Sequence, residues 1–134
     1  FIIDHVKFSC MEQFMMYQKA ITFQDQTIAK EILQTRDSAK IKQMGRQVRN
    51  YNDHIWNGIR QIVVYEGLIA KFSQNEELKK QLKETKTAIL AECAVKDRIW
   101  GIGLSMKDLK RFDITQWRGQ NLLGYALMEV RKRL

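Results

Sequence analysis

The stretch NDHIWNGIRQIVVYEGLIAKF, residues 52–72, decides the fold class of this chain. Its first two residues are of types that cap a helix N-terminus. Its apolar residues then recur at intervals of three and four, the spacing of one helical face; they are Ile55, Ile59, Ile62, Val63, Ile69 and Phe72. The stretch therefore predicts one long helix. Gly58 and Gly67 each cost it about 1 kcal/mol against alanine, which the close approach of another backbone or a ligand would justify.

The segments on either side also favour helices. Helical patterns opened by a capping residue run over residues 25–35, 37–48, 75–85 and from 121 to the end of the chain. The segment MEQFMMYQKAI, residues 11–21, is apolar nearly all round, and this indicates burial on most faces. We expect Ser9 to be its N-cap and Glu12, three residues on, to be the reciprocal capping partner.

The remaining segments are less regular. Residues 1–8, FIIDHVKF, have the pattern of a short β-hairpin. Residues 87–95, TAILAECAV, fit a buried strand or a helical turn, because periodicity does not separate the two. WGIGLS, residues 100–105, predicts a loop with an exposed aromatic, and residues 106–112 predict one or two helical turns. We expect a mainly α fold, a compact orthogonal helical domain with a short N-terminal β-hairpin.

The composition narrows the function classes. The 134 residues, which we expect to form a single domain, have a formal net charge of +8 and no proline. A basic domain favours anionic partners such as phosphates or nucleic acid, although a solvated lysine-rich surface explains the same charge. Two cysteines and two histidines match no zinc or disulfide framework, and no segment approaches the roughly 18 apolar residues of a membrane span. We expect no metal, no cofactor, no membrane and a reduced, cytoplasmic setting.

Sequence motifs of common enzymes are absent. No Walker-type loop, Rossmann fingerprint or nucleophile elbow occurs, and the Gly-Ile-Gly of residues 101–103 is too short for a phosphate loop. Catalysis would rest on carboxylates, a lysine and aromatics. Glu12 and Lys19 are the first candidates, because seven residues bring a helix nearly full circle and leave the two on one face, roughly 10 Å apart. Met15 and Met16 lie between them, and a charged group beside such apolar side chains is costly to bury unless it is paired or has a function. The alternative is that Glu12 completes the capping box and Lys19 reaches water.

A second candidate group lies in KDRIWGIG. Asp97 precedes Trp100 and Gly101, and a short acid beside an aromatic can hold a water near a stacked base or sugar. The alternative, which is the commoner use of such an aspartate, is to accept hydrogen bonds from the amides of its own turn.

Further candidates are basic and aromatic. Trp56 and Arg60 are four residues apart and share one face of the long helix. Arg60 can bind a phosphate through two parallel hydrogen bonds, or it can stack on Trp56 as ordinary packing. Arg46 and Asn121 are weaker candidates of the same kind. The basic residues 131–133 complement the dipole of the last helix, which is a commoner role than a nucleic-acid patch.

Six segments, taken in order, resemble the NADAR family, also called YbiA-like. They are MEQFMMYQKA (11–20), GRQV (45–48), WNGIR (56–60), KFSQN (71–75), AECAVKDRIWGIG (91–103) and WRGQNLLGYALMEVRKRL (117–134). Each is weak alone, but six collinear matches over nearly the whole chain make the resemblance specific.

The resemblance implies a compact, mainly helical domain that is an N-glycosidase. Members of the YbiA branch cleave the bond between base and ribose in early riboflavin-pathway intermediates, and other members remove ADP-ribose from modified guanine in DNA. Both reactions split a ribosyl C1–N bond beside a phosphate-bearing sugar. The family's usual segment upstream of the hairpin is missing, and the chain starts at Phe1 rather than at a methionine. We therefore expect the N-terminal part of the family domain to precede residue 1.

The resemblance also assigns residues. The helix acid of the family falls on Glu12, its helix lysine on Lys19 and its acid before the Trp-Gly pair on Asp97. Trp100 would flank the pocket. The other expected substrate-binding or supporting residues are Trp56, Arg60, Arg46, Gly101 and Asn121.

We thus expect a monomeric, metal-independent N-glycosidase whose substrate is an ADP-ribosyl or ribosyl-phosphate compound, with DNA or RNA carrying the modified base in one version. Glu12 and Asp97 would stabilise the oxocarbenium ion or activate water, and Lys19 would donate a proton or attack C1 to form a Schiff base. The alternative is a non-catalytic module that binds ADP-ribose or NAD. The intact set of two acids and a lysine argues against that alternative.

Overall fold

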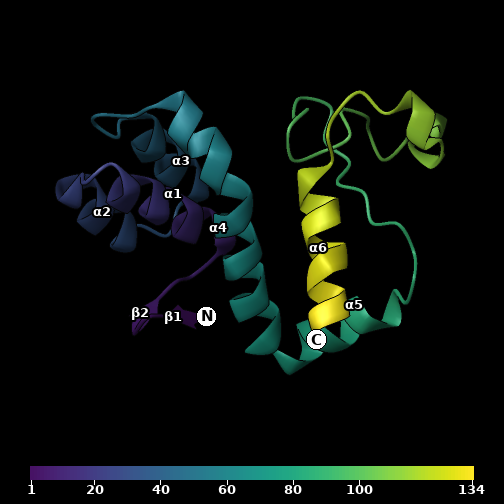
Figure 1. The fold of residues 1–134 in the computed structure, drawn as a ribbon, viewed down its shortest axis with the longest axis horizontal. Helices are drawn as coiled ribbons and strands as arrows, with labels where there is room; N and C mark the ends of the chain where they lie inside the picture. The colour runs from purple at the N-terminus through teal and green to yellow at the C-terminus, as the bar shows by residue number, and fades with distance from the viewer. The chain divides into compact units, whose positions relative to one another are not determined.

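The computed structural model describes residues 1–134 as two compact units, Phe1–Asn75 and Glu76–Leu134. The first unit holds a two-stranded hairpin and four helices, and the second holds two helices and two short 3₁₀ helices. The predicted mainly α fold with a short N-terminal β-hairpin is confirmed (Figure 1). That the two units make up a single domain stays a prediction.

The first unit is built around its first helix. Its elements are β1 (Ile2–Ile3), β2 (Val6–Lys7), α1 (Met11–Thr22), α2 (Gln26–Leu33), α3 (Ser38–Arg46) and α4 (Asp53–Ser73). The two strands pair antiparallel. Helix α1 contacts α2, α3 and α4, while the hairpin lies against α4 (Figure 1). A side chain on α1 can therefore meet residues from three other helices.

Three helices of this unit begin where the sequence predicts. The Asp25 carboxylate accepts a hydrogen bond from the backbone N–H of Ile28 and opens α2. Asp37 opens α3 in the same way, and Asn52 opens α4. These side chains satisfy N–H groups that have no partner inside the helix.

The core of the first unit explains one of the two glycines in α4. Phe8 and Phe14 are buried and meet edge to face with ring centroids 5.0 Å apart. A Cβ on Gly67 would lie 2.7 Å from the side chains of Phe14 and Met11, so close packing of core side chains, rather than the expected backbone or ligand, accounts for this glycine. No atom lies within 4 Å of the corresponding point on Gly58.

The predicted apolar face of α4 is wrong at two positions. Ile55 and Ile62 are 50% and 59% exposed. The buried residues of α4 are instead Trp56, Val63, Val64, Gly67 and Leu68. These follow a neighbouring stripe, because the side of α4 that meets α1 is rotated from the side that the isoleucines mark.

The second unit contains more irregular chain. Its elements are α5 (Glu76–Glu84), the 3₁₀ helices η1 (Leu109–Phe112) and η2 (Ile114–Gln116), and α6 (Leu122–Arg133). Segment 87–95 is neither the strand nor the helical turn that periodicity allowed. Its backbone is hydrogen-bonded by tertiary partners: Glu92 O accepts from Ile102 N at 2.9 Å, and Glu92 N donates to the side chain of Asn121. None of the helices in the chain is both long enough and apolar enough to cross a membrane.

Candidate functional site

The start of α1 differs from the predicted capping box. Cys10 is the N-cap and makes no side-chain capping bond, so the helix begins one residue later than expected. Gln13 then occupies the third helical position, and its Oε1 accepts hydrogen bonds from Ser9 N at 2.7 Å and Ser9 Oγ at 3.2 Å. Glu12 therefore takes no part in capping. The expected capping role of this carboxylate is wrong, which leaves the carboxylate available for chemistry.

Glu12 is a half-buried acid among cations. Burial raises the pKa of its carboxyl group, and the positive charges of Lys42, Arg46 and Lys19 oppose that rise. Because burial prevails, Glu12 holds its proton to a higher pH than an exposed glutamate does. A carboxyl group that keeps its proton to a higher pH than usual can act as a proton donor as well as a proton acceptor.

Lys19 is the matching amine on the same helix. Burial lowers the pKa of its ammonium group; Arg46 lowers it further, while Asp53 and Glu12 raise it. Its Nζ lies 4.4 Å from the centre of the Tyr51 ring. Lys19 is thus held against an aromatic face and loses its proton more readily than an exposed lysine.

Tyr51 and Asp53 belong to this site, although the sequence did not reveal them. Partial burial and a hydrogen bond to Asp53, followed by the negative charge of Asp53, raise the pKa of Tyr51 to about 12, against the charge of Arg60. The phenol is neutral at pH 7 and donates its hydrogen to the Asp53 carboxylate. No spacing rule links Tyr51 to Lys19, because the contact is made only when the start of α4 folds against α1.

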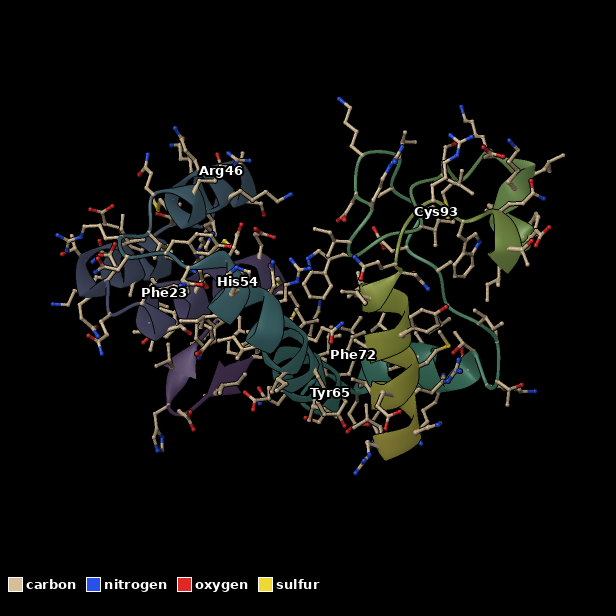
Figure 2. The ribbon with its side chains drawn as sticks, turned by 45° about the horizontal axis from the view of Figure 1, so that its top comes forward. Phe23, Arg46, His54, Tyr65, Phe72 and Cys93 are labelled. Atoms are coloured by element: carbon tan, nitrogen blue, oxygen red, sulfur yellow. The ribbon has the colours of Figure 1, made fainter.

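A glycine brings α3 close to α1. A Cβ on Gly45 would collide with the side chain of Met16, so only glycine lets α3 come this close to α1. The positive charge of the next residue, Arg46, then lowers the pKa of both Glu12 and Lys19. Arg46 at the end of α3 and His54 in the first turn of α4 mark the two elements that flank α1 in Figure 2.

Asp25 holds the connection that leads to Tyr51. Its buried carboxylate accepts from Arg49 N at 3.0 Å and lies 3.7 Å from the Arg49 guanidinium. The hydrogen bond from the Arg49 backbone is the main reason that the pKa of Asp25 is lowered.

We refer to Glu12, Lys19, Arg46, Tyr51 and Asp53 as the α1 site.

Two predicted substrate-binding residues lie on α4. Trp56 is 6% exposed and belongs to the hydrophobic core of the first unit, which favours the packing alternative for its side chain. Arg60 is half-buried, and its positive charge lowers the pKa of Tyr51, so it lies at the margin of the α1 site.

The other predicted residues lie in the second unit. Asp97 Oδ1 accepts from Ile99 N at 3.0 Å and Trp100 N at 2.8 Å, which is the turn-capping use of an aspartate. Trp100 is half-buried rather than exposed. A Cβ on Gly101 would lie 2.9 Å from the carbonyl oxygens of Asp97 and Glu92, so this position has no room for a side chain.

Asn121 fixes the loop that contains Asp97. It is fully buried in the left-handed region (φ 53°), where its Oδ1 accepts from Glu92 N and its Nδ2 donates to Leu90 O, both at 2.9 Å. Its backbone N–H donates to Gly101 O at 3.0 Å. Asn121 therefore acts as a support, since both ends of its amide are bonded to backbone. No group of three or more His, Cys, Asp or Glu side chains in the chain is arranged to hold a metal ion.

Comparison with known proteins gives a consistent result. The family model described as NADAR domain matches residues 1–134. N-glycosidase R617 of Acanthamoeba polyphaga mimivirus is 40% identical over 96% of this chain and 76% of its own length. N-glycosidase YbiA of Escherichia coli is 31% identical over 88% of this chain and 67% of its own length.

A solved structure and one further relative extend the comparison. The NMR structure of E. coli YbiA superposes with a TM-score of 0.79 and 29% identity, over 98% of this chain and 70% of that one. A protein named Riboflavin biosynthesis protein VVA0006, from Vibrio vulnificus, is 30% identical over 94% of this chain but only 31% of its own length. Sequence and fold agree over both units, and the chain belongs to the NADAR domain family, which includes N-glycosidases.

Proposed function

We propose that this chain hydrolyses a ribosyl C1–N bond beside a phosphate-bearing sugar, with Glu12 and Lys19 as its central catalytic groups. One observation carries the proposal: a single face of α1 presents an acid whose pKa is raised and an amine whose pKa is lowered. Paired groups whose environments move both pKa values toward neutrality are typical of acid–base sites. The names of the N-glycosidase relatives support the same reaction class.

The reaction needs two kinds of help. Breaking the C1–N bond builds positive charge on the ribose and negative charge on the leaving base. A carboxylate stabilises the first or removes a proton from the attacking water, and an acid protonates the second. We assign the carboxylate work to Glu12. The family resemblance adds Asp97 of the second unit, although its Oδ1 accepts from two turn amides. Arg46 supplies positive charge for a substrate phosphate.

Lys19 has two roles to distinguish. As a proton donor, the Lys19 ammonium protonates the leaving base. The resulting amine regains its charge by taking the proton that the attacking water releases. As a nucleophile, its neutral amine forms a bond to C1 while the C1–N bond breaks, the base leaves with a proton, and ring opening gives a Schiff base that water then hydrolyses. The lowered pKa of Lys19 increases the neutral fraction on which the second route depends.

Borohydride separates the two roles, because it reduces a Schiff base to a stable amine. The nucleophilic route predicts a covalent adduct on Lys19 during turnover and none in Lys19→Gln. Lys30→Gln is the matched control, since Lys30 is an exposed lysine of the same unit. Substrate cleavage without an adduct assigns Lys19 the role of proton donor.

The substrate test uses two compounds. One is an oligonucleotide carrying ADP-ribosylated guanine, which the net charge of +8 favours. The other is a phosphorylated ribosylaminouracil, which the name of the Vibrio relative favours. Release of free ADP-ribose from the first, or of the base from the second, identifies the substrate. Tight ADP-ribose binding with no cleavage of either compound would replace the proposal by the binding-module alternative.

A further inference from the structure

We propose that the second unit also carries a phosphate-binding site, which takes backbone phosphates of a nucleic acid strand. The site is a hollow of about 420 Å³ between the end of α5 and the last turn of α6. Its lining consists of four cations and one hydroxyl: Lys83, Lys86, Thr87, Arg131 and Lys132. We refer to it as the basic hollow. The inference does not rest on the glycosidase activity.

The lining is suited to phosphate. It includes no carboxylate, so a bound oxyanion meets the cationic groups, one hydroxyl and the aliphatic stems of the lysines. Arg131 is already fixed, because its Nη1 donates to Thr85 Oγ1 at 2.8 Å. A guanidinium held by one nitrogen still presents other N–H groups in a rigid plane, which match phosphate oxygens.

One acid lies close to the basic hollow. Glu129 pairs with Lys132 at 3.9 Å and with Arg133 at 3.6 Å, and all three side chains are at least 46% exposed. Exposed pairs of this kind contribute little free energy. A phosphate can therefore take the Lys132 ammonium from Glu129 at small cost.

The backbone at Lys86 takes a left-handed conformation. Lys86 has φ 54°, and its N–H donates to Lys83 O at 3.1 Å just after α5 ends. This left-handed position at a helix C-terminus is usually occupied by glycine, because a side chain there is strained. The side chain that this backbone position carries lines the basic hollow, and a glycine at residue 86 would keep the turn while removing the cation.

Helix stabilisation and membrane binding are the competing roles for these cations. Cations at the ends of α5 and α6 also stabilise the helix dipoles, and that role alone predicts an effect on stability without an effect on phosphate binding. A membrane surface is disfavoured, because membrane-binding faces combine cations with exposed apolar side chains, and the lining has none. Nucleic acid fits best, since a strand offers several phosphates to several cations.

The test compares two double variants with the same loss of charge. Lys83→Gln/Lys86→Gly removes two cations of the basic hollow, and the glycine relieves the left-handed backbone. Lys80→Gln/Lys107→Gln removes two exposed lysines of the same unit that do not line it. Binding of an unmodified single-stranded oligonucleotide is measured by fluorescence anisotropy at several salt concentrations, and the thermal midpoint of each variant is recorded.

We expect the first double variant to bind more weakly and to lose about 1.4 from the slope of log K against log salt, at about 0.7 per phosphate contact, with an unchanged or higher thermal midpoint. The control keeps most of the slope. Equal weakening in both variants would overturn the proposal, because only net charge would then matter. Pyrophosphate binding that depends on Lys83 and Lys86, without oligonucleotide binding, would overturn the nucleic acid assignment and give the hollow to small phosphate compounds. If the chain binds neither the oligonucleotide nor pyrophosphate, the proposal is also overturned.

Discussion

At the scale of single residues, the α1 site depends on which side chain caps the helix. Gln13 satisfies the groups before α1, and so Glu12 remains half-buried near three cations without a structural task. Lys19 shares that environment and gains the ring of Tyr51. Both groups are costly in their charged forms, as burial moves both pKa values toward neutrality. Costly charges that no structural role explains are characteristic of catalytic residues.

The cost of the Glu12 charge predicts a gain in stability when the charge is removed. A raised pKa in the folded state means that stability falls as pH rises from the ordinary value of 4.5 through the folded pKa. At pH 7 we expect the thermal midpoint of Glu12→Gln to equal or exceed that of the wild type. The difference should shrink to nothing as the pH falls below 4.5, where both forms are neutral. Thermal scans from pH 4 to pH 8 measure it, and a clearly lower midpoint at pH 7 would show that Glu12 is structural.

Tyr51 predicts a shift in the pKa of Lys19. The ring stabilises the ammonium form by about 0.5–1 kcal/mol, which is roughly half a pKa unit. We expect Tyr51→Leu to lower the pKa of Lys19 by about that amount and Tyr51→Phe to change it less, because phenylalanine keeps the ring. NMR titration of ¹³C-methylated lysines gives the value directly. Equal shifts in the two variants would assign the effect to the hydroxyl and Asp53 instead.

At the scale of elements, the site is formed where α3 and α4 meet α1. Glycine permits the close approach of α3 to Met16, and a buried aspartate fixes the connection to α4. Capping residues at 25, 37 and 52 set the first residues of three helices, which sequence patterns predict well. Patterns do not predict which stripe of α4 is buried, because its tertiary partners select it.

The two glycines of α4 give a matched pair of predictions. Gly58→Ala should raise the free energy of unfolding by up to about 1 kcal/mol, since alanine favours the helix and meets no atom within 4 Å. Gly67→Ala should lower it by about 1–3 kcal/mol, because the new methyl group would overpack against Phe14. Denaturant unfolding of both variants measures the difference. A stabilised Gly67→Ala would mean that α1 and α4 are less tightly packed than described.

At the scale of the whole molecule, local patterns predicted most elements but not the tertiary part of the site. The hairpin, the capped helices and the face shared by Glu12 and Lys19 follow from spacing alone. No sequence pattern indicates Tyr51, because its contact with Lys19 joins segments that are far apart in the chain. Local patterns do not predict the irregular 87–95 segment either, since two of its hydrogen bonds come from Asn121, 29 residues away or more.

The placement of the remaining candidates is mixed for the same reason. Arg46 lies where it acts on both Glu12 and Lys19. Trp56 packs in the core, and Asn121 supports a loop. Sequence patterns show which residues are polar or aromatic, but burial and partners decide which of them can meet a substrate.

The most direct test of the account is the single-turnover rate of C1–N cleavage, with whichever of the two substrates the chain cleaves. The comparison is between wild type, Glu12→Gln and Glu31→Gln, which makes the same change at an exposed glutamate of the same unit. Positioned acid–base groups contribute about 10²–10⁴-fold. The account predicts a loss of that size in Glu12→Gln and no loss in Glu31→Gln, with both variants folded. A Glu12→Gln variant that cleaves at the wild-type rate would contradict it.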